Sequence, residues 1–208
     1  NVVVLAGNNR SKASYISKSI KAGLHVFADK PMAINKAGFE QLKKSFARAD
    51  AKKLLLYDIM TERFQVTNRL QKELSMLPAV FGELQKGTLE DPAVITNSTH
   101  HFFKLVSGKP LVRPDWFFDA EQQGEGLVDV TTHLVDLVQW QCFPGQEIDY
   151  GKDIRMLSAE RWPTPMTITQ FKEITGDTGY PGFLTKHVKD SILQVYANGE
   201  MNYTIRGV

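Results

Sequence analysis

The sequence predicts a mixed fold, in which a short α/β segment over residues 1–60 precedes a larger α+β domain over residues 61–208. Three observations predict it. Strand-like and helix-like segments alternate regularly up to about residue 60, which is typical of a parallel sheet covered by helices. Beyond that point the strand-like segments are longer and the helices fewer, which indicates an open, mostly antiparallel sheet packed against helices. With 42% hydrophobic and 23% charged residues, the chain can fill a sizeable core.

The first part reads as strand, helix, strand, helix, strand. Each strand is a short apolar run, and each helix carries apolar residues at helical spacing. Gly23 follows the first helix as a C-cap, and Asn35 precedes the second helix as an N-cap. The predicted elements are, in chain order, 2–6, 11–22, 24–28, 36–49 and 53–57.

The second part begins with a helix near residues 62–76, followed by a long strand signal over 93–105. A loop rich in Pro, Gly and Asp leads to a helix over 124–143. That helix is apolar almost all round, which is typical of a buried helix. Two further strand signals lie near 154–162 and 190–206, with a Gly-rich loop between them.

Charge and cysteine content exclude several classes of protein. The chain has 25 basic and 23 acidic residues, and no Lys/Arg block is longer than a pair, so we expect no nucleic-acid partner. Cys142 is the single cysteine, which excludes an intrachain disulfide. No apolar stretch reaches the roughly 18 residues that a membrane span needs, so we expect no membrane partner either.

Both ends of the chain read as segments of folded structure. The chain opens on a buried-looking strand, NVVVLAG, and closes on the strand-like run YTIRGV. We therefore expect an internal piece of a longer protein, whose own N-terminal segment decides the compartment. A cytoplasmic location is our expectation, with the periplasm as the alternative.

A polar stripe runs along the helix predicted late in the chain. Asp129, His133 and Asp136 stand at i, i+4 and i+7, within about 40° of rotation from Asp129. Burying two carboxylates and an imidazole is costly unless water or partners meet them. The stripe is therefore expected to face a wet cavity, and the alternative is a structural Asp–His pair. Gly124 and Gly126, just before it, would let a ligand approach the helix N-terminus.

A second candidate site is the sequence Asp29-Lys30-Pro31 at the end of the second predicted strand. In open parallel sheets, ligands bind beyond the carboxyl ends of the strands. The turn that contains Asn9 ends the neighbouring strand and lies at the same edge. Proline restricts the backbone after Lys30, and an X–Pro bond can be cis, which would fix the direction of the ammonium. The alternative is an ordinary turn with a solvated lysine.

Together these segments closely resemble the Gfo/Idh/MocA family of NAD(P)-dependent oxidoreductases. The segments are VVVLAGNN, AGLHVFADKPMAIN and GEGLVDVTTHLVDLVQW, in that order and at the family's separation. Members carry an Asn-containing turn, an EKP tripeptide and a GGG…D…H…D helix, and ERF at 62–64 looks like the family's Arg-Phe. The matching positions are Asn9, Lys30, Pro31, Gly124, Gly126, Asp129, His133 and Asp136.

The sequence departs from the family pattern at specific places. Asp29 replaces the usual Glu, Glu125 interrupts the triple glycine, and Lys12 stands where many members have a histidine. Residues 144–190 are longer and more irregular than usual and resemble a variant C-terminal domain of putative oxidoreductases. The family's Gly-rich phosphate loop is absent, so residues 1–60 correspond to the remnant of a parallel Rossmann-type sheet.

The resemblance implies hydride transfer between a nicotinamide, NAD or NADP, and a hydroxyl-bearing carbon of a sugar, polyol or related carbohydrate. His133 has an unperturbed pKa near 6.5 and is the candidate base. Asp129 would orient the imidazole or bind a substrate hydroxyl. Lys30 would stabilise the developing alkoxide.

Further residues are assigned around this core. The cofactor-binding residues implied by the resemblance are Asn9, Asp29, Lys30 and Pro31. Trp116 is a candidate for lining the sugar pocket, because aromatic rings suit sugar C–H surfaces, and Asp136 is a weaker candidate for the substrate site.

Two other functions stay open. A branch of the family cleaves glycosides with bound NAD, through transient oxidation. The second alternative is a non-catalytic domain that binds carbohydrate or associates with copies of itself, and the resemblance implies a homo-oligomer formed through the open sheet. We expect no metal site, since His100 and His101 are adjacent on a predicted strand and would point to opposite faces.

Overall fold

The computed structural model describes residues 1–208. By their internal contacts the residues form two compact units, which are described in turn. The first unit comprises 1–59, 100–129 and 163–198, and the second comprises 60–99, 130–162 and 199–208. Three long elements, α5 (Leu127–Cys142), β6 (Ile154–Met166) and β8 (Ile192–Ile205), contribute residues to both units.

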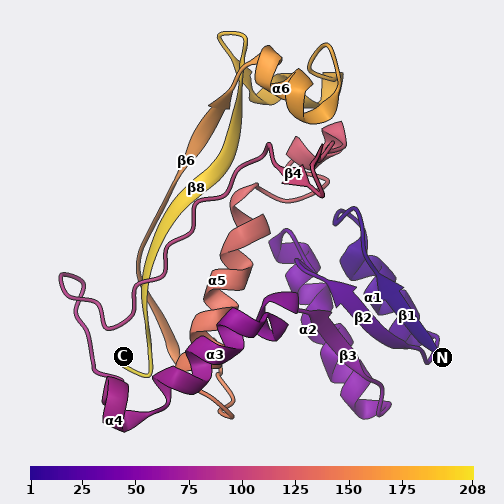
Figure 1. Cartoon of the computed structure of the whole chain (residues 1–208). Helices are drawn as coiled ribbons and strands as arrows, with labels where there is room; N and C mark the ends of the chain where they lie inside the picture. Colours follow the sequence, from indigo (N-terminus) through magenta and orange to yellow (C-terminus); the bar gives the residue numbers. More distant parts are fainter. The chain divides into compact units, whose positions relative to one another are not determined.

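The first unit opens with a three-stranded parallel sheet (Figure 1). Its strands lie in the order β1 (Val2–Leu5), β2 (His25–Asp29) and β3 (Leu56–Ile59). Val4 pairs with Phe27, which pairs with Tyr57. Two helices, α1 (Lys12–Lys21) and α2 (Lys36–Ala51), connect the strands. Since all three strands are parallel, their carboxyl ends meet at one edge.

Both connecting helices cover the same face of this sheet. Their apolar side chains form one cluster with the inward residues of the strands, because Val26 and Ala28 alternate with outward residues along β2. Gly23, with φ +80°, ends the turn after α1, and the side chain of Asn35 accepts a hydrogen bond from the Gly38 N–H at 2.8 Å. The cluster consists of Ile16, Ile20, Val26, Ala28, Leu42, Ala49 and Leu56.

A second apolar cluster in the first unit is built mainly from the later part of the chain. Helix α6 (Ile168–Thr175) contributes Phe171, which is fully buried and packs against the rings of Phe118 and Tyr180. The buried members of the cluster are Phe118, Met166, Phe171, Ile174, Leu184, Leu193 and Val195. The remaining short elements of this unit are β4 (Leu105–Val106), β5 (Lys109–Pro110), η2 (Asp115–Phe118), η3 (Gly182–His187) and β7 (Val188–Lys189).

The second unit contains the 3-10 turn η1 (Thr61–Phe64) and the helices α3 (Val66–Ser75) and α4 (Pro78–Phe81). It also contains most of α5 and parts of β6 and β8. The sheet to which these strands belong has the order β6-β8-β7, with β7 and β8 antiparallel. Figure 1 shows β6 and β8 as long strands that run side by side. None of the helices is both long enough and apolar enough to span a membrane.

The predicted fold class is correct, and most predicted elements form. The strand predicted over 93–105 is wrong, since only Leu105 of that range is in a strand, the two-residue β4. The third strand begins at Leu56 rather than at residue 53, and α6 was not predicted. The division into domains over 1–60 and 61–208 stays a prediction.

Candidate functional site

The end of β2 places Lys30 at the carboxyl edge of the parallel sheet. The Asp29 carboxylate accepts a hydrogen bond from the Lys30 backbone N–H at 2.9 Å, which shapes the end of the strand locally. The Lys30–Pro31 peptide bond is cis. Strand β2 ends at Asp29, so the lysine side chain is carried at the position where α/β sheets bind ligands.

Lys30 contacts Asp129, the first residue of the polar stripe on α5. The Lys30 Nζ lies 2.8 Å from the Asp129 Oδ1, and it also donates to the Asp129 backbone oxygen. The side chains are 15% and 25% exposed, so the pair is largely shielded from solvent. Two residues that the sequence places 99 positions apart are thus brought together within the first unit.

The Asp129 carboxylate stays ionised although it is shielded. Burial raises its pKa, but the hydrogen bond and charge of Lys30, with the charges of Arg113 and His100, outweigh burial and bring the pKa below its usual value of 3.8. The imidazole of His100 shows the opposite effect, since its charged form is disfavoured and its pKa is lowered. Burial and the cations Lys104, Arg113 and Lys30 lower its pKa, against the single attraction of Asp129.

A buried lysine supports the backbone next to this pair. Lys12 is only 2% exposed, and its Nζ donates a hydrogen bond of 2.9 Å to the backbone oxygen of Asp29. Burial lowers the pKa of the Lys12 ammonium, the Asp29 carboxylate raises it, and Lys30 lowers it further, with a net decrease. The side chain from the first turn of α1 therefore ties that helix to the residue before Lys30.

Asn9 lies in the same region but faces the protein interior. It is 2% exposed, its backbone N–H donates to the Gln122 oxygen at 3.1 Å, and its Nδ2 donates to the Gln123 oxygen at 2.8 Å. Its Oδ1 is buried and has no hydrogen-bond partner. Asn9 therefore holds the loop that leads into α5, and its Oδ1 remains as an acceptor without a donor. Its predicted contact with a cofactor stays a prediction.

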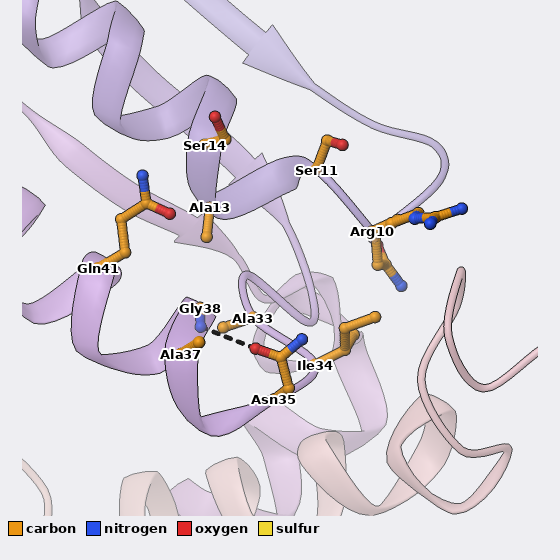
Figure 2. A pocket seen from close by; sticks show the side chains of 11 residues that line it. Arg10, Ser11, Ala13, Ser14, Ala33, Ile34, Asn35, Ala37, Gly38 and Gln41 are labelled. Atoms are coloured by element: carbon orange, nitrogen blue, oxygen red, sulfur yellow. Dashed lines mark hydrogen bonds between the residues drawn. The ribbon is translucent and has the colours of Figure 1, made fainter.

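A small cavity of about 240 Å³ lies beside Asn9, between the first turns of α1 and α2 (Figure 2). Figure 2 shows Asn35 turned toward the Gly38 backbone, with Ser14 coming from α1 and Ser11 from the position just before that helix. The lining side chains are small or neutral apart from Arg10. The lining residues are Asn9, Arg10, Ser11, Ala13, Ser14, Ala33, Ile34, Asn35, Ala37, Gly38 and Gln41.

The two glycines before α5 serve internal packing. At Gly124, where φ is +90°, a Cβ would lie 3.0 Å from the Ile34 Cγ2 and 3.1 Å from the Val128 Cγ2. At Gly126 a Cβ would lie 3.2 Å from the Ala197 Cβ. The expectation that these glycines open the helix N-terminus to a ligand is therefore replaced by a different cause, the close approach of the protein's own side chains.

The later residues of the stripe lie in the second unit. Asp136 forms an ion pair with Arg63, in which Nε lies 2.7 Å from Oδ2 and Nη2 contacts Oδ1. Arg63 belongs to the ERF segment, so that segment anchors the helix. His133 is half-buried on α5. The predicted roles of His133 as base and of Asp136 at the substrate stay predictions.

Arg113 is a residue that sequence reasoning missed. Its guanidinium is buried, its Nε donates to the Phe102 oxygen at 3.1 Å, and it lies 4.3 Å from the Phe117 ring centroid. Burial lowers the pKa of Arg113, and the Asp129 charge raises it, with a net decrease. The residue sits in a proline-flanked loop without periodicity. The only signal was its place between aromatic segments shortly before the predicted helix.

Trp116, predicted at the sugar pocket, lies in η2 beside Phe117. Its side chain is half-buried, and its backbone N–H donates to the Asp115 carboxylate at 2.6 Å. The first unit thus brings together Lys30, Asp129, Arg113 and His100 through contacts or charge, with Lys12 supporting Lys30. The prediction that Trp116 contacts substrate stays a prediction.

Open parallel sheets bind ligands beyond the carboxyl ends of their strands, and Lys30 lies at such an end. The family model described as "putative oxidoreductase C terminal domain" matches residues 70–208. The chain therefore belongs to the Gfo/Idh/MocA-type oxidoreductases, whose C-terminal domain it carries.

Solved structures agree with this assignment. A protein from Parabacteroides merdae, described as a putative oxidoreductase, is 55% identical with a TM-score of 0.95. The match covers 100% of this chain and 47% of that protein, so the chain spans about half the length of this relative.

Two more distant structures share the fold alone. They are KijD10, a 3-ketoreductase from Actinomadura kijaniata in complex with NADP and TDP-benzene, and an NAD-binding protein from Listeria innocua. KijD10 is 19% identical with a TM-score of 0.50, over 76% of this chain and 41% of its own. The Listeria protein is 15% identical with a TM-score of 0.53, over 77% of this chain and 40% of its own. A search of curated proteins gave no match.

Proposed function

We propose that the protein is an NAD(P)-dependent oxidoreductase that transfers a hydride between the nicotinamide and a hydroxyl-bearing carbon of a sugar, polyol or related carbohydrate. The contact between Lys30 and Asp129 carries this proposal, because it brings the first residue of the predicted stripe to the sheet edge within the first unit. Membership of the oxidoreductase family supports the reaction type.

The residues at the sheet edge fit a nicotinamide ribose by their chemistry. Ribose hydroxyls are hydrogen-bond donors, and this edge offers the Asp29 carboxylate together with the buried Asn9 Oδ1, which lacks a partner. Asn9, Asp29, Lys30 and Pro31 would hold the cofactor. When bound, the nicotinamide supplies the hydride acceptor or donor.

The proton chemistry is assigned to α5. Oxidising an alcohol requires a base for the hydroxyl proton, and the imidazole of His133 takes that role. Asp129 stands one turn earlier on the same helix and binds a substrate hydroxyl or orients the imidazole. The Lys30 ammonium stabilises the negative charge that develops on the substrate oxygen, as a fixed charge in a shielded place.

The test uses the full-length protein and two substitutions, Lys30→Met and His133→Ala. Each is expected to lower turnover by about two orders of magnitude or more, which is the usual size of general acid–base help. Nicotinamide absorbance measures the rate. The controls are Lys44→Met and His101→Ala, which remove the same side chains at exposed positions. Near-wild-type rates for both site variants would remove the assignment.

The same assays separate the two alternative functions. Cleavage of a chromogenic glycoside without net NADH formation would favour the NAD-dependent glycoside hydrolase. Absence of NADH binding in a fluorescence titration of the full-length protein would favour a domain that only binds carbohydrate or associates with itself.

We also propose that the protein forms a homo-oligomer through its open sheet. Along β6 the side chains alternate between two faces. Asn202 of β8 donates to Ser158 of β6 at 3.1 Å, so these two side chains lie on the same face of the sheet. Met156, on the face of Ser158, is 52% exposed. An exposed apolar side chain on this sheet supports association with a second copy.

A further inference from the structure

The guanidinium of Arg113 is held in one orientation inside the first unit. Its side chain is only 9% exposed. The backbone N–H of Arg113 donates to the Ile174 oxygen at 3.0 Å, its Nε donates to the Phe102 oxygen at 3.1 Å, and the group lies 4.3 Å from the Phe117 ring centroid. A stacked and hydrogen-bonded guanidinium has lost most of its freedom, so its outer edge is preorganised.

That outer edge has no partner in the protein. A guanidinium carries five N–H donors, and in Arg113 only the Nε–H has an acceptor. The Nη atoms are not among the buried side-chain atoms that lack a partner, so they reach solvent, and an anion can approach them. The four remaining N–H groups form the planar fork that matches the two oxygens of a carboxylate or phosphate.

The charged side chains around Arg113 favour the binding of a further anion. Asp129 is the only carboxylate that acts on either Arg113 or His100, and its Oδ1 is bound to Lys30 at 2.8 Å. Lys30 is the ion-pair partner of Asp129, whereas the Arg113 guanidinium, which also acts on Asp129, has no carboxylate bound to it. His100 and Lys104 add to the positive side when protonated.

We propose that Arg113, together with Lys30, binds an oxyanion group carried by the substrate, so that the preferred substrate is an acidic carbohydrate, either a sugar carboxylate or a sugar phosphate. This inference rests on the proposed function for the identity of the ligand as a substrate. The oxyanion site itself rests on the unpaired fork of Arg113, held in place through its Nε, and on the ion pair that already joins Asp129 to Lys30.

The site gives the reaction a means of positioning. The oxyanion takes two parallel hydrogen bonds from the Arg113 fork, which fixes both the distance and the plane of the bound group. Lys30 lies against Asp129 within the same set of charges, so the anchored substrate is held next to the residue assigned to the developing alkoxide. Binding energy from a group that does not react is thereby used to orient the carbon that does.

A purely structural Arg113 is the competing explanation, in which the residue only compensates Asp129. The two explanations predict different behaviour of the variants. A structural residue changes thermal stability alike with and without ligand. An oxyanion-binding residue changes the affinity for anions, and Arg113→Lys, which keeps the charge but loses the fork, recovers only part of it.

The first experiment measures binding of inorganic phosphate and of acetate to the full-length protein by NMR titration. We expect Arg113→Gln to weaken the binding by about 10-fold or more, because charge-assisted hydrogen bonds are lost. Arg113→Lys is expected to be intermediate, and Lys109→Gln, which removes an exposed charge, to leave it unchanged. Equal affinity for either anion in wild type and both Arg113 variants would overturn the site.

The second experiment compares hydride transfer on sugar carboxylates, sugar phosphates and their neutral counterparts, and its arms identify which oxyanion is used. We expect a higher kcat/KM for one acidic class, with the advantage lost in Arg113→Gln. Activity confined to neutral sugars and unaffected by Arg113→Gln would overturn the inference and leave the proposed function standing. If no carbohydrate is oxidised, the proposed function fails, and the binding titration alone decides on the oxyanion site.

Discussion

The carboxylate of Asp129 shows how a shielded charge is kept ionised in this protein. Burial alone would favour its neutral form, yet Lys30, Arg113 and His100 together lower its pKa. The group therefore binds its proton more weakly in the folded chain than in the unfolded chain. The stability that its charge contributes must then depend on pH.

Replacing Asp129 by Asn tests this dependence. Asn keeps the shape and the acceptor oxygen but removes the charge, so we expect a loss of about 1–3 kcal/mol in the free energy of unfolding near neutral pH. Because the folded pKa is depressed, the contribution is complete above the usual value of 3.8 and disappears as pH falls through the folded pKa. Urea unfolding of both proteins between about pH 7 and pH 2 measures it.

The curves of the two proteins should converge at the acidic end. The control is Asp50→Asn, an exposed carboxylate for which the difference from wild type should stay small at every pH. A constant difference for Asp129→Asn over the whole range would show that the lost charge is not the cause.

The individual residues of the site were predictable to different extents. Lys30 and Asp129 stood in recognisable motifs, and helical spacing alone marked the stripe on α5. Arg113 was not predictable, because its importance depends on the Phe102 oxygen and on Phe117, which only folding brings to it. The ion pair of Asp136 with Arg63 likewise depends on a contact between residues 73 positions apart.

Among the elements, α6 illustrates a local signal strong enough to fix both ends of a helix. Thr167 and Gln170 form a capping box, in which the Thr167 Oγ1 accepts from the Gln170 N–H at 3.3 Å and the Gln170 Oε1 accepts from the Thr167 N–H at 2.8 Å. Gly176, with φ +86°, ends the helix.

Replacing Thr167 by Ala removes one half of this box. We expect a loss of about 1 kcal/mol in the free energy of unfolding, the usual effect of deleting an N-cap side chain. Chemical denaturation followed by circular dichroism measures it. Thr167→Ser keeps the hydroxyl and should remain within a few tenths of a kcal/mol of wild type. Equal losses for Ala and Ser would mean that the methyl group matters rather than the cap.

The elements also show where sequence reasoning fails. The T-x-x-Q pattern before α6 and the glycine after it were readable signals for a helix. The segment 93–105 was a strand by residue preference, yet its residues up to 104 pair with no strand. A strand requires a neighbour for its backbone hydrogen bonds, and preference alone does not supply one.

At the scale of the whole molecule, buried apolar residues are distributed unequally between the two units. Both apolar clusters belong to the first unit. In the second unit only Phe143 and Ile205 are buried apolar residues. The alternation of strands and helices was enough to predict the first cluster. The second cluster could not be predicted, because its residues come from loops and short helices without a common period.

The proposed association through the sheet leads to a prediction about Met156. Met156→Lys places a charge on the sheet face that carries Ser158 of β6 and Asn202 of β8, so we expect the oligomer to dissociate to a smaller species. Light scattering coupled to size exclusion measures the mass. Val80→Lys adds the same charge at a side chain that is 66% exposed on α4, and it should leave the mass unchanged. An unaltered mass for Met156→Lys would exclude this face as the interface.

The bond from Lys12 to the Asp29 carbonyl has a consequence for how this position can vary during evolution. A backbone carbonyl oxygen accepts a hydrogen bond from any N–H that reaches it, whether or not the donor side chain is charged. The Lys12 Nζ meets that requirement with its hydrogen bond of 2.9 Å. Leucine or methionine at position 12 would fill the volume but would leave the Asp29 carbonyl without this hydrogen bond. We therefore expect this position to accept only residues whose side chain offers an N–H that reaches the Asp29 carbonyl.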